Sequence, residues 1–229
     1  MSDIKLENDI GVEQIVDVPV GRVRLEGALA VPQHATSIVV FAHGSGSSRH
    51  SPRNNAVARV FRHAGFATLL LDLLTAREDA SYETRFDIGL LTERLGATTR
   101  WLRHHADTRR LRIGYFGAST GAAAALDAAA ESRDDVAAVV SRGGRPDLAT
   151  MLDRVTAPTL LIVGSNDEEV LELNRQAFAE LTCEKDLAIV NGATHLFEEP
   201  GALDEVARLA TAWFRRYLVS ATPAASRTE

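Results

Sequence analysis

Nearly continuous apolar runs alternate along this chain with segments of helical periodicity. The runs, which are rich in Val, Ile, Leu and Phe, lie at 37–42, 66–74, 111–116, 136–141, 158–164 and 187–190. Such runs are typical of strands buried on both faces of a parallel sheet. The predicted helices that separate them lie at 52–65, 87–105, after residue 119 in an alanine-rich stretch, weakly at 148–152, at 168–181 and at 202–218. The alternation predicts an α/β fold with a mostly parallel sheet and helices on both faces.

The remaining segments are short. Residues 14–18 and 22–31 are predicted to form an antiparallel hairpin around Gly21. The polar stretch 75–86 separates the predicted strand at 66–74 from the predicted helix at 87–105, and it is too short to form a large lid over a site. We find no internal repeat or linker, so residues 1–219 are expected to form one domain, with 220–229 as a flexible tail of small and polar residues.

Charge and composition narrow the class of protein. The 229 residues carry 31 acidic and 25 basic side chains, a net charge of −6 that favours neither nucleic acid nor an anionic membrane as partner. The single cysteine, Cys183, excludes an internal disulfide and a cysteine-built metal site. The sequence has no signal-peptide core and no run of about 20 apolar residues. We therefore expect a cytoplasmic protein, and its oligomeric state stays open, a homodimer included.

One motif points to chemistry. Gly117-Ala118-Ser119-Thr120-Gly121 lies between a predicted strand and the alanine-rich helix, which is the context of a G-x-S-x-G nucleophile elbow. There the glycines at 117 and 121 make room for a sharp turn that exposes the serine. The alternative is a glycine-rich turn with Ser119 as an ordinary helix cap.

A serine nucleophile needs a base to take its proton and an acid to orient that base. In α/β folds that carry such an elbow, the acid and then the histidine follow the serine along the chain. Asp167 lies directly after the strand at 158–164, and His195 lies after the strand at 187–190. Alone, Asp167 would be interpreted as a helix N-terminal acid and His195 as a surface loop residue. The order and placement of all three favour a catalytic triad.

An oxyanion hole requires two amide donors, one of them from the residue after the nucleophile. Thr120 supplies that amide. The loop His43-Gly44-Ser45-Gly46 follows the strand at 37–42, and Ser45 is the expected second donor. A plain tight turn is the alternative for this loop. His43 is expected to support the loop and not to act as a base.

With these motifs in place, the sequence resembles the α/β-hydrolase superfamily, and most closely its dienelactone hydrolase-like branch. Four segments carry the resemblance in order: VVFAHGSGSS, GYFGASTGAAAAL, TLLIVGSNDEEV and NGATHLFEEPG. The resemblance implies the α/β-hydrolase fold, triad roles for Ser119, Asp167 and His195, oxyanion roles for Ser45 and Thr120, and no cofactor or metal.

The nucleophile of this elbow differs from that of the dienelactone hydrolases themselves, which carry cysteine where this chain has Ser119. The expected activity is therefore hydrolysis of small carboxylic esters, lactones included, by a serine esterase. An acyltransferase or amidase with the same triad, or a non-catalytic binding protein on the scaffold, are the alternatives.

Arginines follow several of the strand ends. Arginine suits two-point contact with a carboxylate or phosphate, so these residues are candidates for binding an acidic substrate. The alternative for each is a surface charge or a structural ion pair, with Asp72 as one available partner. The candidates are Arg49, Arg53, Arg85 and Arg142.

Overall fold

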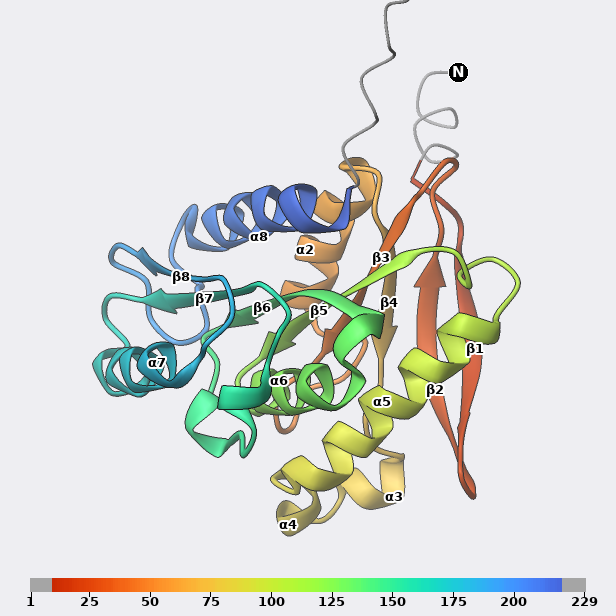
Figure 1. The fold of residues 1–229 in the computed structure, drawn as a ribbon, viewed down its shortest axis with the longest axis horizontal. Helices are drawn as coiled ribbons and strands as arrows, with labels where there is room; N and C mark the ends of the chain where they lie inside the picture. Colours follow the sequence, from red (N-terminus) through yellow and green to blue (C-terminus); the bar gives the residue numbers. More distant parts are fainter. Residues whose placement is uncertain (1–9, 220–229) are drawn as a thin grey trace, which may run out of the picture.

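Eight strands form one sheet in the part of the chain that the structure, a computed structural model, describes, which is residues 10–219 (Figure 1). Their order across the sheet is β1-β2-β4-β3-β5-β6-β7-β8. β1 and β2 pair antiparallel, as do β2 and β4, and all later pairs are parallel. The strands are β1 (Glu13–Val20), β2 (Val23–Ala30), β3 (Ser37–Ala42), β4 (Ala67–Leu71), β5 (Arg112–Ala118), β6 (Val136–Arg142), β7 (Thr159–Gly164) and β8 (Lys185–Val190). The expected mostly parallel sheet is confirmed.

Helices cover both faces of the sheet, which explains why β3, β4 and β7 are buried at every position. One face packs against α2 (Pro52–His63) and α8 (Ala202–Leu218). The other packs against α5 (Ile88–His104), α6 (Thr120–Ser132) and α7 (Glu168–Glu180), as Figure 1 shows. A strand between two helical layers has no water-facing side, so an apolar residue is favoured at each position.

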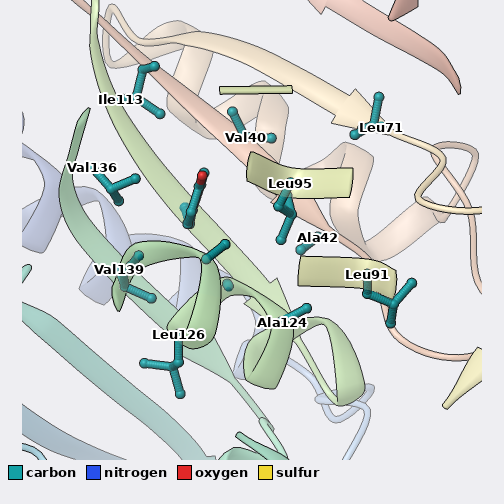
Figure 2. Packing of buried hydrophobic residues seen from close by; sticks show 14 of the residues in the cluster. Val40, Ala42, Leu71, Leu91, Leu95, Ile113, Ala124, Leu126, Val136 and Val139 are labelled. Carbon is teal, nitrogen blue, oxygen red and sulfur yellow. The ribbon is translucent and has the colours of Figure 1, made fainter. Parts of the chain in front are cut away.

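The face under α5 and α6 is filled mostly by aliphatic side chains, with the fully buried Tyr115 among them (Figure 2). Val40 and Val139 come from the sheet, Leu95 from α5 and Ala124 from α6, and all four are fully buried. Alanine is well suited to α6, because its small side chain lets the helix lie close to the strands while it keeps the highest helix propensity. This close packing fixes the start of α6 against the end of β5.

Phenylalanines fill the opposite face. Phe61 of α2 lies between Phe41 and Phe116 of the sheet and Phe214 of α8, with ring centroids 5.5–5.7 Å away. Such tilted and edge-on pairs add to the free energy of burial itself. The cluster fixes α2, and with it the loop that leads from β3 into that helix.

One expectation about residues 66–86 needs correction, and the same stretch contains two helices that the sequence analysis did not predict. The strand predicted at 66–74 ends at Leu71, and the polar stretch 75–86 contains two one-turn helices, α3 (Ala76–Asp79) and α4 (Tyr82–Arg85). Thr75 and Ser81 accept hydrogen bonds from the backbone of these helices as N-caps. Both N-cap residues can be seen in the sequence. A four-residue helix, however, is too short to show the repeating spacing of apolar residues by which a helix is predicted.

The helix predicted at 148–152 is wrong. Two 3-10 turns, Pro146–Leu148 and Leu152–Arg154, occupy this region. Between them the backbone amides of Thr150 and Met151 donate to the carboxylate of Asp127, at 2.9–3.0 Å. Because a buried side chain from α6 satisfies these amides, the segment needs no helical hydrogen bonds.

The parallel strands end at one edge of the sheet, where the turns after β3, β5, β6, β7 and β8 meet. Among residues 10–219, no helix has the length and apolar character that a membrane span requires. The predicted tail, 220–229, lies outside the described residues.

Candidate active site

Ser119 occupies a strained turn at the carboxyl edge of the sheet. It lies between β5, which ends at Ala118, and α6, which begins at Thr120. Its backbone has φ 49° and ψ −124°, in a region that non-glycine residues rarely adopt. The Ser119 amide donates to the carbonyl of Arg142 at 3.4 Å, and the Ser119 carbonyl accepts from the Arg145 amide at 3.1 Å. The turn is thus held to the end of β6, and Ser119 makes no side-chain cap bond to its own helix.

Glycines surround this turn because no side chain fits. A Cβ at Gly117 would lie 2.5 Å from Ala122 Cα, and one at Gly121 would lie 2.3 Å from the carbonyl oxygen of Ala42. A Cβ at Gly44 would lie 2.9 Å from Cβ of Ser119. Backbone from β3, β5 and α6 is therefore in direct contact around Ser119, as the elbow interpretation requires.

Asp167 and His195 are hydrogen-bonded to each other. Asp167 Oδ2 lies 2.7 Å from His195 Nδ1. A carboxylate can only accept, so Nδ1 carries the proton and Nε2 is left as a base. Asp167 is the N-cap residue of α7 but makes no cap bond, because its carboxylate faces His195. The side chain of Asp167 is 15% exposed and that of His195 is 38% exposed.

Close backbone contacts hold these two loops together. Gly164 ends β7, and a Cβ there would lie 2.2 Å from the carbonyl oxygen of Ala193. The Asn166 amide donates to that same carbonyl at 2.9 Å. Thr194 in turn donates through its hydroxyl and its amide to Glu199 Oε1, at 2.6 and 3.1 Å. These two hydrogen bonds restrain the loop that carries His195. Threonine and glutamate five positions apart are too common for the sequence to have predicted them.

Gly143 links Ser119 to His195. It follows Arg142, whose carbonyl binds the Ser119 amide, and a Cβ on Gly143 would lie 3.1 Å from the His195 carbonyl oxygen and 3.6 Å from its Nδ1. Within the described residues no hydrogen bond joins Ser119 Oγ to His195. In proteins without ligand, catalytic hydrogen bonds of this kind are often long and shorten only when substrate binds.

The expected oxyanion loop is held to the elbow by a side chain. The Ser45 amide donates to Thr120 Oγ1 at 2.9 Å, so the hydroxyl of Thr120, and not only its amide, belongs to this site. As the first residue of α6, Thr120 has an amide with no intrahelical acceptor. Two amides, of Ser45 and Thr120, thus lie beside Ser119. The sequence analysis missed the role of the threonine hydroxyl.

His43 supports the same loop. Its Nε2 accepts from the Leu73 amide at 3.1 Å, and its Nδ1 lies 3.0 Å from the Gly44 carbonyl oxygen. An amide can only donate and a carbonyl can only accept, so His43 is neutral with its proton on Nδ1. Both ring nitrogens are engaged, which leaves none to act as a base.

The four candidate arginines divide into two groups. Three have carboxylate partners, and the pairs are Arg49 with Asp72 and Glu26, Arg53 with Glu198, and Arg85 with Asp79. Arg142 has no ion pair with any residue in the described range 10–219. Arg49 and Asp72 also line a cavity of about 430 Å³ beside the oxyanion loop, but Ser119 is not among its lining residues. These ion pairs are the ones that the structural alternative expects, and a role of Arg49, Arg53 or Arg85 in binding substrate stays a prediction.

Among residues 10–219, no group of three or more His, Cys, Asp or Glu side chains is placed to hold a metal ion. Cys183 lies away from the elbow. Its Sγ is 3.7 Å from Oγ1 of Thr159, the first residue of β7. Burial raises the pKa of the Cys183 thiol.

Comparison with known proteins shows which family and fold this chain resembles. A dienelactone hydrolase from Anabaena variabilis is 56% identical, with a TM-score of 0.90, over 91% of this chain and 99% of that one. A serine hydrolase without a lid from Xanthomonas campestris has a TM-score of 0.74 at 22% identity, over 92% of this chain and 97% of that one, a likeness in fold alone.

Two curated proteins of Mycobacterium tuberculosis, both provisionally named phosphoribosyl transferases, are 57% identical over 212 residues. These residues make up 92% of this chain but 48% of each relative. The chain thus spans about half the length of the curated relatives it matches. The model of the dienelactone hydrolase family matches residues 25–218. This chain belongs to the dienelactone hydrolase family.

Proposed function

We propose that this protein is a serine hydrolase that cleaves small carboxylic esters through an acyl-enzyme. Ser119 Oγ attacks the ester carbonyl while His195 Nε2 takes its proton, and Asp167 keeps the imidazole in the tautomer with the proton on Nδ1. The protonated histidine then gives the proton to the leaving alcohol. A water molecule, deprotonated by His195, releases the acid and restores the serine.

The observation that carries the proposal is the strained backbone of Ser119, with φ 49°, at the sheet edge to which the Asp167–His195 pair also belongs. Strain of this kind persists only where the surrounding structure holds it, and it clusters at active sites. The amides of Ser45 and Thr120 are the proposed oxyanion donors. The Ser45 amide donates to Thr120 Oγ1 in this structure. A bound oxyanion would therefore share this amide with Thr120 Oγ1 or take the place of that oxygen as its acceptor.

The transferase name of the mycobacterial relatives refers to proteins about twice this length, so we do not extend it to this chain. The features that support hydrolysis all lie within residues 25–218, the stretch that matches the hydrolase family. The short insert between β4 and α5, with only the helices α3 and α4, supports an open site and short acyl groups.

The test is hydrolysis of 4-nitrophenyl acetate by the protein and by its Ser119→Ala variant. We expect the variant to lose activity by several orders of magnitude and to keep its circular dichroism spectrum. A fluorophosphonate probe should label Ser119 alone. An active alanine variant, or labelling of another residue, would refute the proposal. Product analysis with added alcohol or with a matched amide would show whether transfer or amide cleavage competes with hydrolysis.

A further inference from the structure

Asn174 is a polar side chain in the interior of the protein. It lies on α7 and is fully buried. Its Nδ2 donates to the carbonyl oxygen of Gly144 at 3.0 Å and to that of Val170 at 2.7 Å. Its Oδ1 is buried and makes no hydrogen bond within residues 10–219, which costs free energy that an apolar side chain would not. What asparagine adds over an apolar residue is the pair of bonds that Nδ2 donates.

The bond to Gly144 joins α7 to the connection between β6 and β7. Val170 belongs to the same helix as Asn174, whereas Gly144 comes directly after β6 in the chain, two residues past its end. The backbone at Gly144 is tightly enclosed, because a Cβ there would lie 2.0 Å from Ser141 Oγ and 2.7 Å from Ala122 Cβ. The strand end, the first turn of α6 and the amide of Asn174 therefore all hold this one peptide.

The residues on either side of Gly144 contact the nucleophile and the base. A Cβ on Gly143 would lie 3.1 Å from the carbonyl oxygen of His195. The Arg145 amide donates to the carbonyl of Ser119 at 3.1 Å. These three consecutive glycine and arginine residues form a junction segment, which touches the loops of the nucleophile and of the base and is bonded at its centre to α7.

The same helix carries the third member of the triad. Asp167 is the N-cap residue of α7, seven positions before Asn174. Positions seven apart lie on the same face of a helix, so Asn174 is buried on the face from whose end Asp167 reaches His195. Through Asn174, the helix that positions the acid is bonded to the segment that holds Ser119.

From these contacts we infer that Asn174 is a positioning residue, which sets the distance between Ser119 Oγ and His195 Nε2 by tying α7 to the junction segment. The inference rests on the proposed function, because it is in that reaction that a proton passes between these two atoms. The loops of Asp167 and His195 are held together by backbone contacts of their own. Without the amide of Asn174, the pair would therefore shift as a unit relative to Ser119.

The first experiment measures kcat and KM for 4-nitrophenyl acetate with the Asn174→Leu variant, in which the side chain cannot donate to Gly144. We expect kcat to fall by about 10- to 100-fold, as for a misplacement of about 1 Å, with KM changed less. The pH at which kcat is half-maximal should stay the same, because the bond between Asp167 and His195 is intact. An unchanged kcat, or a shift of that pH, would overturn the inference.

Asp127→Asn is the matched control. Asp127 is also a buried side chain, 3% exposed, and it binds the same connection between β6 and β7 further along, at the amides of Thr150 and Met151. This variant should lower Tm and keep kcat, since those amides do not contact the triad loops. If Asn174 only stabilised the fold, its leucine variant would behave in the same way, and the inference would be wrong.

Asn174→Thr takes the place of the leucine variant if that protein does not fold. Threonine has nearly the volume of asparagine, and its hydroxyl can donate to the Val170 carbonyl four residues earlier in the helix. The shorter side chain does not reach Gly144, so the link to the junction segment alone is lost. We expect the same fall in kcat, and a kcat equal to that of the unaltered protein would overturn the inference.

The second experiment does not depend on turnover. Hydrogen exchange of the Gly143 and Arg145 amides is measured by NMR in the unaltered protein and in Asn174→Thr. Both amides are hydrogen-bonded, to the carbonyls of Ile162 at 2.8 Å and Ser119 at 3.1 Å. We expect both to exchange faster in the variant, because local opening of the junction segment then costs less free energy. Unchanged exchange would overturn the inference, whereas absence of ester hydrolysis by the unaltered protein would refute only the proposed function.

Discussion

Replacing Gly121 by alanine tests whether the packing around Ser119 is as tight as the structure indicates. The new Cβ would lie 2.3 Å from the carbonyl oxygen of Ala42 and 2.5 Å from that of His43. Both are backbone atoms at the end of β3, so neither can rotate away as a side chain would. Contacts of a Cβ below 3.0 Å are essentially never seen. To reach that limit, the start of α6 and the end of β3 would have to separate by about 0.7 Å.

The cost follows from the kind of atoms involved. Overpacking of a core typically costs about 1–3 kcal/mol. We expect the upper end, about 3 kcal/mol, because the neighbours are strand backbone in the middle of the sheet. For a chain of this size the loss corresponds to a fall in Tm of about 6–12 °C. Activity should fall as well, since the separation moves Ser119 away from the Ser45 amide.

The assay is thermal unfolding followed by circular dichroism, with 4-nitrophenyl acetate kinetics on the same samples. Gly96→Ala is the matched control. Gly96 lies inside α5, where a Cβ would meet only Nη1 of Arg100 at 3.5 Å. That variant should gain about 1 kcal/mol, the difference in helix propensity between the two residues. The reasoning is wrong if Gly121→Ala is as stable as the unaltered protein, or if both variants shift Tm in the same direction.

Two further predictions concern side chains near the sheet edge. Thr120→Val removes the hydroxyl that accepts from the Ser45 amide. We expect kcat to fall by about 2- to 10-fold, as for a lost hydrogen bond, with little change in KM, and Thr120→Ser should restore kcat. A valine variant with a higher kcat would show that the hydroxyl competes with the oxyanion instead. Because burial raises the pKa of Cys183, alkylation of this thiol by iodoacetamide should require a pH well above the value of about 8.5 that an exposed thiol needs. Mass spectrometry of the modified fraction against pH measures this, and a half-maximal rate at or below pH 8.5 would contradict it.

The hydrophobic pattern was sufficient for the sheet and its covering helices. An apolar run such as 37–42 can only be stable where both faces are covered, so the pattern required the layers that the structure has. The elbow was found for a similar reason, because Gly117 and Gly121 have a geometric meaning that needs no partner from elsewhere. The predicted helix at 148–152 failed, because its amides are satisfied by Asp127 from a distant element.

Local patterns in the sequence were enough for features that neighbouring residues impose on one another: the strands, the long helices, the sharp turn at Ser119 and the order of the three candidate residues. The pairing of side chains became visible only in the folded chain. Arg49, Arg53, Arg85 and Arg142 look alike in the sequence, yet among residues 10–219 three meet a carboxylate and one is buried without any. The physical reason is that a charge is stabilised by groups close to it in space, and the fold brings these together from segments far apart in the chain.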